Sequence, residues 1–370
     1  MASSVGTLKK RAATNLQVNG SPKVRRNTKG GGKSECSKRG SKSSGIDMNY
    51  QQVTAVGRNS PLDIVHPSYM HLHPPANEEE IDEDEEEQTF AHFVEYGKRN
   101  PNATGTGRWK LAKKRNKILI LVVEPGGGEQ SMFTTSELKQ YIEAFFQLDA
   151  DCAELGMGTI DIGNKRINLN SPSRSSHMSS HPLRLLDLNS KAKKSKKSKL
   201  AYALDVFSLF DALVQLVVEP YISCLALINY KLAEEWDSSI TEVLGRACGD
   251  RICCVSLPCH DSKREIFWTS THELLHTIGF DHCTSFHCIM NAFNSLEKAT
   301  LFLSPPNLRK LKNFHNIPDF DNGAFLIKHY KELLYVVRDF DALSTENREF
   351  ERDCIWLESK INALKQIFPE

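Results

Sequence analysis

The sequence lacks any long apolar run. Its longest uninterrupted stretch, Ile118 to Val123, is far below the ~20 residues that span a bilayer. No apolar stretch follows the positive charges of the N-terminus, so a secretory signal is not expected. The net charge is only +1, from 47 basic and 46 acidic residues, which excludes a globally basic nucleic-acid binder. We expect an intracellular protein, cytoplasmic and/or nuclear, that is neither membrane-spanning nor secreted.

Phosphate-binding motifs are also missing. Three glycines follow Glu124-Pro125, but no GK[ST] comes after them and no GxGxxG spacing is present, so a flexible turn is the better interpretation. Ten cysteines in a chain of this length, without a signal peptide, indicate reduced thiols or metal ligands rather than a disulfide framework.

The small net charge hides a strong segregation of charge. Residues 1–50 carry eleven Lys/Arg against two acidic residues, whereas residues 78–87 hold nine acidic side chains. Because regularly spaced apolar residues are scarce here, we expect 1–115 to be a mostly disordered region, basic and then acidic. The basic stretch is either a solvated tail, a nuclear address or a weak nucleic-acid contact.

A folded domain is expected over 116–323. Residues 118–123 (ILILVV) are typical of a buried strand, and the Thr134/Glu137 capping box precedes an amphipathic pattern that predicts a helix. Further strands are predicted at 222–228, 252–257 and 265–268, and a long helix at 200–218. Strands that alternate with helices indicate an α/β or α+β layered fold.

Two segments depart from that pattern. Residues 171–199 are Ser-rich and then Lys-rich, which predicts an exposed loop or insertion. Residues 324–370 carry two apolar stripes at heptad-like spacing. An antiparallel helical hairpin packed on the domain is the simplest interpretation, and a partner-binding coiled coil is the alternative.

The sequence THELLHTIGFDHC carries the chemistry. His272 and His276 are four residues apart, so in a helix they lie on the same face, suitably placed for a zinc ion. Glu273 can take a proton from metal-bound water, while Gly279 ends the helix and lets His282 return as the third ligand. Three protein ligands leave one position for water, which is the arrangement of a catalytic zinc. Met290, eight residues past His282, fits a Met-turn.

The continuation of this motif resembles the archaemetzincin family. Cys283 follows the third histidine directly, Cys288 comes five residues later, and Met290 two further. The resemblance implies an α+β fold: a metzincin-like zincin domain with a mixed sheet over the active-site helix. It also implies a zinc metallopeptidase acting on a peptide or protein substrate, with Glu273 as general base. Nothing in the sequence indicates an oligomeric state.

The resemblance further implies a second, structural zinc, held by Cys283, Cys288 and a later CxxC pair. Here that pair is replaced by Ser304 and Asn307, so a four-thiolate site cannot form and Cys283 and Cys288 are at most part of one. His287 or one of Cys248, Cys253, Cys254 and Cys259 is a substitute ligand only with correct geometry, and buried free thiols are the commoner outcome. This loss, with the low-complexity segments, supports an alternative function as a catalytically weak or inactive zinc-binding interaction protein.

Overall fold

The computed structural model describes residues 88–99, 116–125, 135–149, 151–170, 179–188, 202–237, 239–248, 251–292, 299–315, 323–343 and 348–368. The basic stretch and the acidic run lie outside these residues. The region expected to be mostly disordered, 1–115, also contains helix α4 (Phe90–Arg99), whose Phe93 side chain is fully buried. Among the described helices, each is too short or too polar to span a bilayer.

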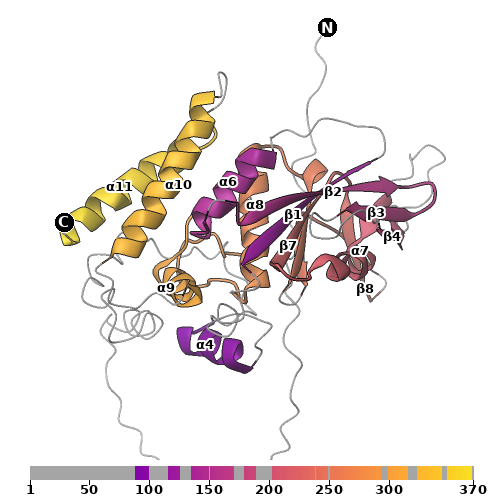
Figure 1. Cartoon of the computed structure of the whole chain (residues 1–370), viewed down its shortest axis with the longest axis horizontal. Helices are drawn as coiled ribbons and strands as arrows, with labels where there is room; N and C mark the ends of the chain where they lie inside the picture. Colours follow the sequence, from indigo (N-terminus) through magenta and orange to yellow (C-terminus); the bar gives the residue numbers. More distant parts are fainter. Residues whose placement is uncertain are drawn as a thin grey trace, which may run out of the picture.

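A seven-stranded mixed sheet forms the centre of the molecule (Figure 1). Its order is β10-β11-β7-β1-β2-β3-β4. The strands β11, β7, β1 and β2 run parallel, and antiparallel strands extend the sheet at both edges. Their bounds are β1 (Lys117–Pro125), β2 (Ala153–Asp161), β3 (Arg166–Asn170), β4 (Ser179–Pro182), β7 (Tyr221–Ile228), β10 (Gly245–Cys248) and β11 (Ile252–Ser256).

Strand β1 is buried on both faces, which explains its uninterrupted apolar sequence. Successive side chains of a strand point to opposite faces, so Ile118 and Ile120 join one core and Leu119 and Leu121 the other. The first core contains α6 (Thr135–Phe145) and α8 (Lys263–Thr277), and the second contains α7 (Val206–Leu213). Helices therefore cover the two faces of the sheet, and α8 contacts β7, β10 and β11.

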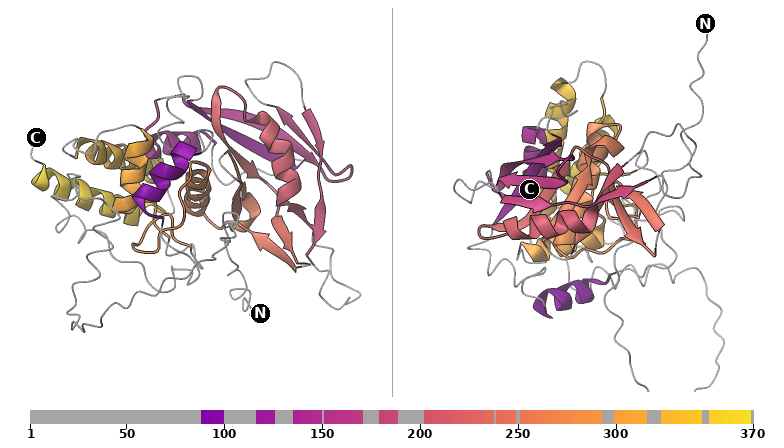
Figure 2. Two further views of the ribbon diagram at one scale, coloured as in Figure 1. Left: turned by 90° about the horizontal axis from the view of Figure 1, so that it is seen from below. Right: turned by 90° about the vertical axis from the view of Figure 1, so that its right-hand side faces the viewer.

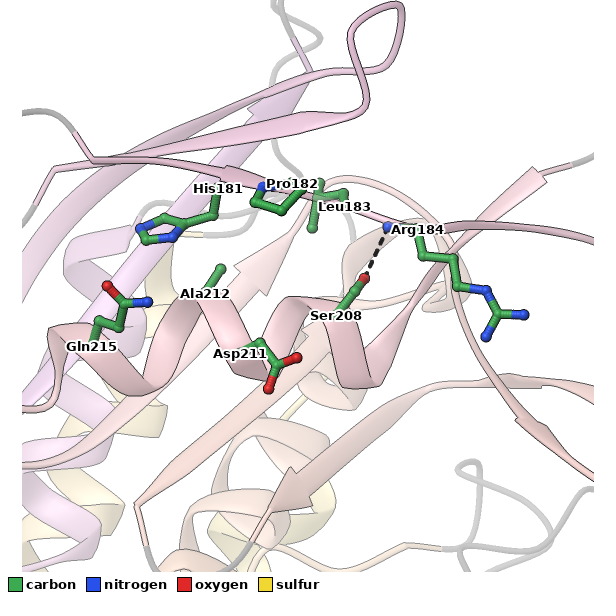
Figure 3. A pocket seen from close by; sticks show the side chains of 8 residues that line it. All are labelled: His181, Pro182, Leu183, Arg184, Ser208, Asp211, Ala212 and Gln215. Atoms are coloured by element: carbon green, nitrogen blue, oxygen red, sulfur yellow. Dashed lines mark hydrogen bonds between the residues drawn. The ribbon is translucent and has the colours of Figure 1, made fainter.

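A smaller sheet of four strands has the order β5-β6-β8-β9. It consists of β5 (Leu185–Asp187), β6 (Tyr202–Asp205), β8 (Leu232–Trp236) and β9 (Ser239–Val243). Strands β4 and β5 lie inside 171–199, so the expectation of an exposed loop is wrong for 179–188; the lysine-rich part is outside the described residues. A shallow pocket of about 440 Å³ lies between this segment and α7 (Figure 3).

The predicted long helix over 200–218 is also wrong. Residues 202–205 form β6, and α7 begins only at Val206. The Asp205 side chain sets this start, because its carboxylate accepts from the Ser208 backbone N–H at 3.2 Å. A short 3-10 helix, η2 (Val214–Leu216), follows.

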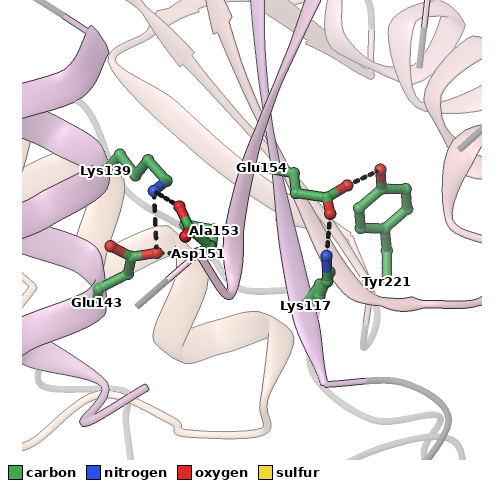
Figure 4. A network of polar contacts seen from close by, with 7 residues as sticks. All are labelled: Lys117, Lys139, Glu143, Asp151, Ala153, Glu154 and Tyr221. Carbon is green, nitrogen blue, oxygen red and sulfur yellow. Dashed lines mark hydrogen bonds and ion pairs between the residues drawn. The ribbon is translucent and has the colours of Figure 1, made fainter. Parts of the chain in front are cut away.

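Polar contacts fasten the start of β1 to its neighbours (Figure 4). The Lys117 ammonium pairs with the Glu154 carboxylate on β2, which also accepts from the Tyr221 hydroxyl on β7 at 2.6 Å. These groups are partly exposed, so the ion pair contributes little to stability.

Three helices complete the described chain: α9 (Pro305–Phe314), α10 (Ala324–Leu343) and α11 (Glu351–Ile367). Two helices are thus present in 324–370, as the apolar stripes predict. They pack together to one side of the sheet, and α10 also contacts α6 (Figure 2). Arg264, in the first turn of α8, binds the buried Asp353 carboxylate of α11 through two hydrogen bonds of 2.6 and 3.0 Å. The C-terminal helices are therefore tied to the helix that carries the histidines.

Candidate metal centre

The helix α8 carries the first two histidines. The strand predicted at 265–268 is wrong, since these residues belong to the first half of α8. Ser262 caps the helix by accepting from the Glu265 N–H at 3.1 Å, and the Glu265 carboxylate reaches back to the Asp261 N–H at 2.7 Å. These two bonds at the first turn outweigh the strand preference of the bulky residues that follow.

The three predicted histidines converge. Their ligand atoms lie within 4.8 Å of one another. The Nε2 atom of His272 is 3.1 Å from that of His276 and 3.3 Å from that of His282. Gly279, with φ of +88°, ends the helical segment and reverses the chain so that His282 returns to the first two rings. Within the part of the chain that the structure describes, no other group of three His, Cys, Asp or Glu side chains is close enough to share a metal ion.

Backbone carbonyls determine the tautomers of two rings. The Nδ1–H of His272 donates to the Ile289 carbonyl at 2.8 Å, and that of His276 donates to the Phe280 carbonyl at 2.7 Å. Burial lowers the pKa of His272 to about 3 and that of His276 well below its usual value, so both rings are neutral. Their Nε2 lone pairs therefore face each other without a proton between them. This arrangement suits a cation, because facing lone pairs otherwise repel.

Glu273 is the adjacent acid. Its side chain is buried, and no hydrogen-bond donor among the described residues reaches its Oε1 atom. Burial raises the pKa of this carboxyl to about 8, and the nearby positive charge of Arg246 opposes the rise. A buried polar atom without an internal partner is costly, and a carboxyl with a raised pKa next to a cluster of ligand side chains is typical of functional sites. The donor set of three converging imidazoles beside one such carboxylate fits a catalytic zinc.

Gly245, at the start of β10, makes room for this carboxylate. A Cβ atom there would lie 2.7 Å from Cγ2 of Thr269 and 2.9 Å from Cγ of Glu273. We therefore expect Gly245→Ala to lower the free energy of unfolding by about 1–3 kcal/mol, measured by urea denaturation. Gly163→Ala is the matched control, because its new Cβ would meet nothing closer than 3.4 Å. Equal stability of the two variants would contradict this packing.

The loop after His282 is held by a residue that no sequence motif singles out. Asn291 is fully buried, and its side-chain oxygen accepts from the Cys288 N–H at 2.6 Å. Its amide nitrogen donates to the carbonyls of Cys283 and Phe286 at 2.6 and 2.8 Å. Met290 is also fully buried, and its carbonyl accepts from the Cys283 N–H at 2.8 Å. These bonds fix the segment whose Ile289 carbonyl orients His272.

The cysteine site contains no four-thiolate set. Cys283, Cys288, Ser304 and Asn307 come together in the core, as their alignment predicts. The Ser304 hydroxyl is 3.4 Å from Cys283 Sγ, while the Ser304 N–H and the Asn307 amide donate to Cys288 Sγ at 3.2 and 3.5 Å. Burial opposes ionisation of Cys288, but hydrogen bonds from Cys283, Ser304, Met290 and Asn307 together lower its pKa to about 6. Two thiols, a hydroxyl and an amide do not fit a structural zinc, and hydrogen bonds join the loop to α9 instead.

The other proposed ligands lie elsewhere. Cys253 and Cys254 are buried in β11, where their thiols donate to the carbonyls of Cys224 and Arg246 at 3.7 Å. Cys259 contacts Ser256 and Glu242. Neither these thiols nor Cys248 and His287 joins Cys283 and Cys288 in a metal-ligating group among the described residues.

Comparison with known proteins adds a distant structural likeness. No protein-family model matches the sequence, and no curated protein matches it significantly. The crystal structure of archaemetzincin from Methanopyrus kandleri is 17% identical, with a TM-score of 0.34, over 52% of this chain and 96% of that chain. The crystal structure of archaemetzincin from Archaeoglobus fulgidus complexed with malonate has 11% sequence identity and a TM-score of 0.30. The match covers 52% of this chain and 99% of that chain. No functional conclusion follows from likeness at this level.

Proposed function

We propose that this protein is a zinc-dependent metallopeptidase. Its zinc ligands are the Nε2 atoms of His272, His276 and His282, and Glu273 is its general base. One observation carries the proposal: three imidazoles converge, with Nε2 of His272 lying 3.1 and 3.3 Å from Nε2 of the other two, and backbone carbonyls bind Nδ1 of the first two rings. The match to the archaemetzincin motif from His272 to Met290 supports the same assignment.

The donor set suits zinc and leaves a ligand position for chemistry. Bound zinc supplies an acidified water molecule and polarises the peptide carbonyl. Glu273 holds the transferred proton at its Oε1 atom, which has no competing donor among the described residues, and then passes it to the leaving amine. The buried surroundings of Glu273 favour such a transfer, because they hold the carboxyl pKa near neutrality.

Substrate binding is assigned to the sheet edge beside α8. The edge strand β10 has β11 as its one strand neighbour within the described residues, and it contacts α8. An extended peptide is able to pair with such an edge through its main chain. Gly245 lies in this strand next to Glu273, so a peptide on β10 would pass close to the proposed base.

Metal removal tests the proposal. The purified protein is expected to contain one zinc ion per chain and to hydrolyse members of a broad peptide library. A chelator should remove both the zinc and the hydrolysis, and added Zn²⁺ should restore them, because the ligands remain in place. Mass spectrometry of the peptides and elemental analysis of the protein measure the two effects.

The second candidate function is that of a catalytically weak or inactive zinc-binding interaction protein. It is favoured by the exposed Tyr335 and Ile355 side chains on α10 and α11, at 76% and 62% of their surface. Solvent-exposed apolar side chains on these helices are suited to contact a partner. Protein that retains one zinc ion yet cleaves no library peptide would favour this function over hydrolysis.

A further inference from the structure

A segment from outside the expected catalytic domain lies against the metal centre. Gln88, just before α4, and Phe93, within α4, are both buried. The helix packs on α9, away from the central sheet (Figure 1). The guanidinium of Arg309 on α9 stacks over the Phe90 ring at 3.9 Å, which anchors the helix there. The segment is therefore docked through an aromatic contact and buried side chains.

Gln88 binds both sides of the turn that separates the second and third histidines. Its side-chain nitrogen donates to the Gly279 carbonyl at 2.9 Å, across 191 residues of sequence. Its side-chain oxygen accepts from the Asp281 N–H at 3.4 Å. A primary amide offers a donor and an acceptor at once, so one side chain can satisfy both backbone groups. Asp281 immediately precedes His282, which makes this turn the element that positions the third ring.

Phe280, in the middle of the turn, is held from the same side. Its ring meets the Phe93 ring edge to face, with centroids 5.2 Å apart. Its carbonyl is the group that accepts from Nδ1 of His276 at 2.7 Å. The α4 segment thus supports both the turn that places His282 and the carbonyl that orients His276.

We propose that Gln88 and Phe93 are positioning residues of the metal centre, which would make 88–99 part of the functional unit. The inference rests on the proposed zinc site, but not on peptide hydrolysis. Metal affinity requires ligand atoms held within about 0.2 Å of their ideal distances. A turn that contains glycine can adopt many backbone conformations. The two hydrogen bonds from the Gln88 side chain therefore restrict the turn to one of them.

Zinc affinity of the full chain, measured by chelator competition, tests this role. Gln88→Ala should weaken zinc binding about 10–100-fold, the usual effect of removing a group that orients a ligand. The visible absorption spectrum of the Co²⁺-substituted variant should also change, because the geometry at His282 relaxes. A purely structural role would lower the melting temperature of the metal-free protein without moving the metal affinity or the spectrum.

Two further variants complete the experiment. Phe93→Leu keeps an apolar side chain in the core but loses the edge-to-face contact, so it should weaken zinc binding in the same direction even if Gln88→Ala folds poorly. His92→Ala, on the exposed side of α4, is the matched control and should behave as wild type. Zinc affinity within twofold of wild type in both Gln88→Ala and Phe93→Leu would overturn the proposal. Protein that binds zinc but hydrolyses nothing would instead refute only the peptidase assignment.

Discussion

Replacing Glu273 with glutamine is expected to lower the kcat of peptide hydrolysis strongly while one zinc ion per chain stays bound. Glutamine has nearly the same shape as glutamate, so the space beside Gly245 stays filled. An amide cannot accept and return a proton at Oε1. General-base assistance contributes about 10²–10⁴-fold to rate, and we expect kcat to fall by that factor. The zinc ligands are untouched, because Glu273 is not among the three converging side chains.

A surface variant separates this effect from a general loss of negative charge. Glu235 on β8 is partly exposed and forms an ion pair with Arg184, so Glu235→Gln removes one charge without entering the metal centre. Its kcat should stay within twofold of wild type. Turnover in Glu273→Gln equal to that of Glu235→Gln would show that the buried carboxylate has a structural role only.

The convergence of the three histidines is predictable from sequence because it depends on short-range geometry. His272 and His276 share a face in any helix, and Gly279 provides the turn that brings His282 back. The grouping of Ser304 and Asn307 with the two cysteines is predictable for another reason, the match of an extended motif. Strand β1 follows from its apolar composition alone, since it is buried on both faces.

The errors arise where one signal competes with another. At 265–268 the bulky residues suggest a strand, but Ser262 and Glu265 form a cap, and that local pair determines the structure. At 200–218 the apolar pattern suggests one long helix, but Asp205 caps a shorter one after β6. In both segments the residue that caps the helix marks where the helix begins.

The contribution of Gln88 has no comparable signal in the sequence. The residue lies beside an acidic run, and its partner at Gly279 is distant in the chain. A side-chain amide that binds a distant turn leaves no periodic pattern or motif in the sequence, so the contact is visible only in the folded structure. The same holds for Asn291, whose three hydrogen bonds within 283–291 become visible only when the loop is folded.

Restoring the two missing thiols is expected to create a second zinc site. In Ser304→Cys/Asn307→Cys, the four thiols should lie close together, because the Ser304 hydroxyl is already 3.4 Å from Cys283 Sγ and the Asn307 amide 3.5 Å from Cys288 Sγ. A tetrahedral site with Zn–S bonds of about 2.3 Å needs only a small expansion of this cluster. The zinc content should rise from one to two ions per chain by elemental analysis. Free zinc at 1,000 times its Kd would then stabilise the folded state by about 4 kcal/mol.

Removing a single sulfur tests whether the four thiols are the site that binds the additional zinc ion. Cys283→Ser, added to the double variant, should return the content to one ion, because three thiolates no longer complete the set. A content of two in that triple variant would place the second ion elsewhere. One ion in the double variant would mean that the hydrogen-bonded packing of Cys288 against α9 is too rigid to accept a metal. In either case the histidine site should keep its own zinc, since its ligands come from α8 and the turn after it rather than from this cluster.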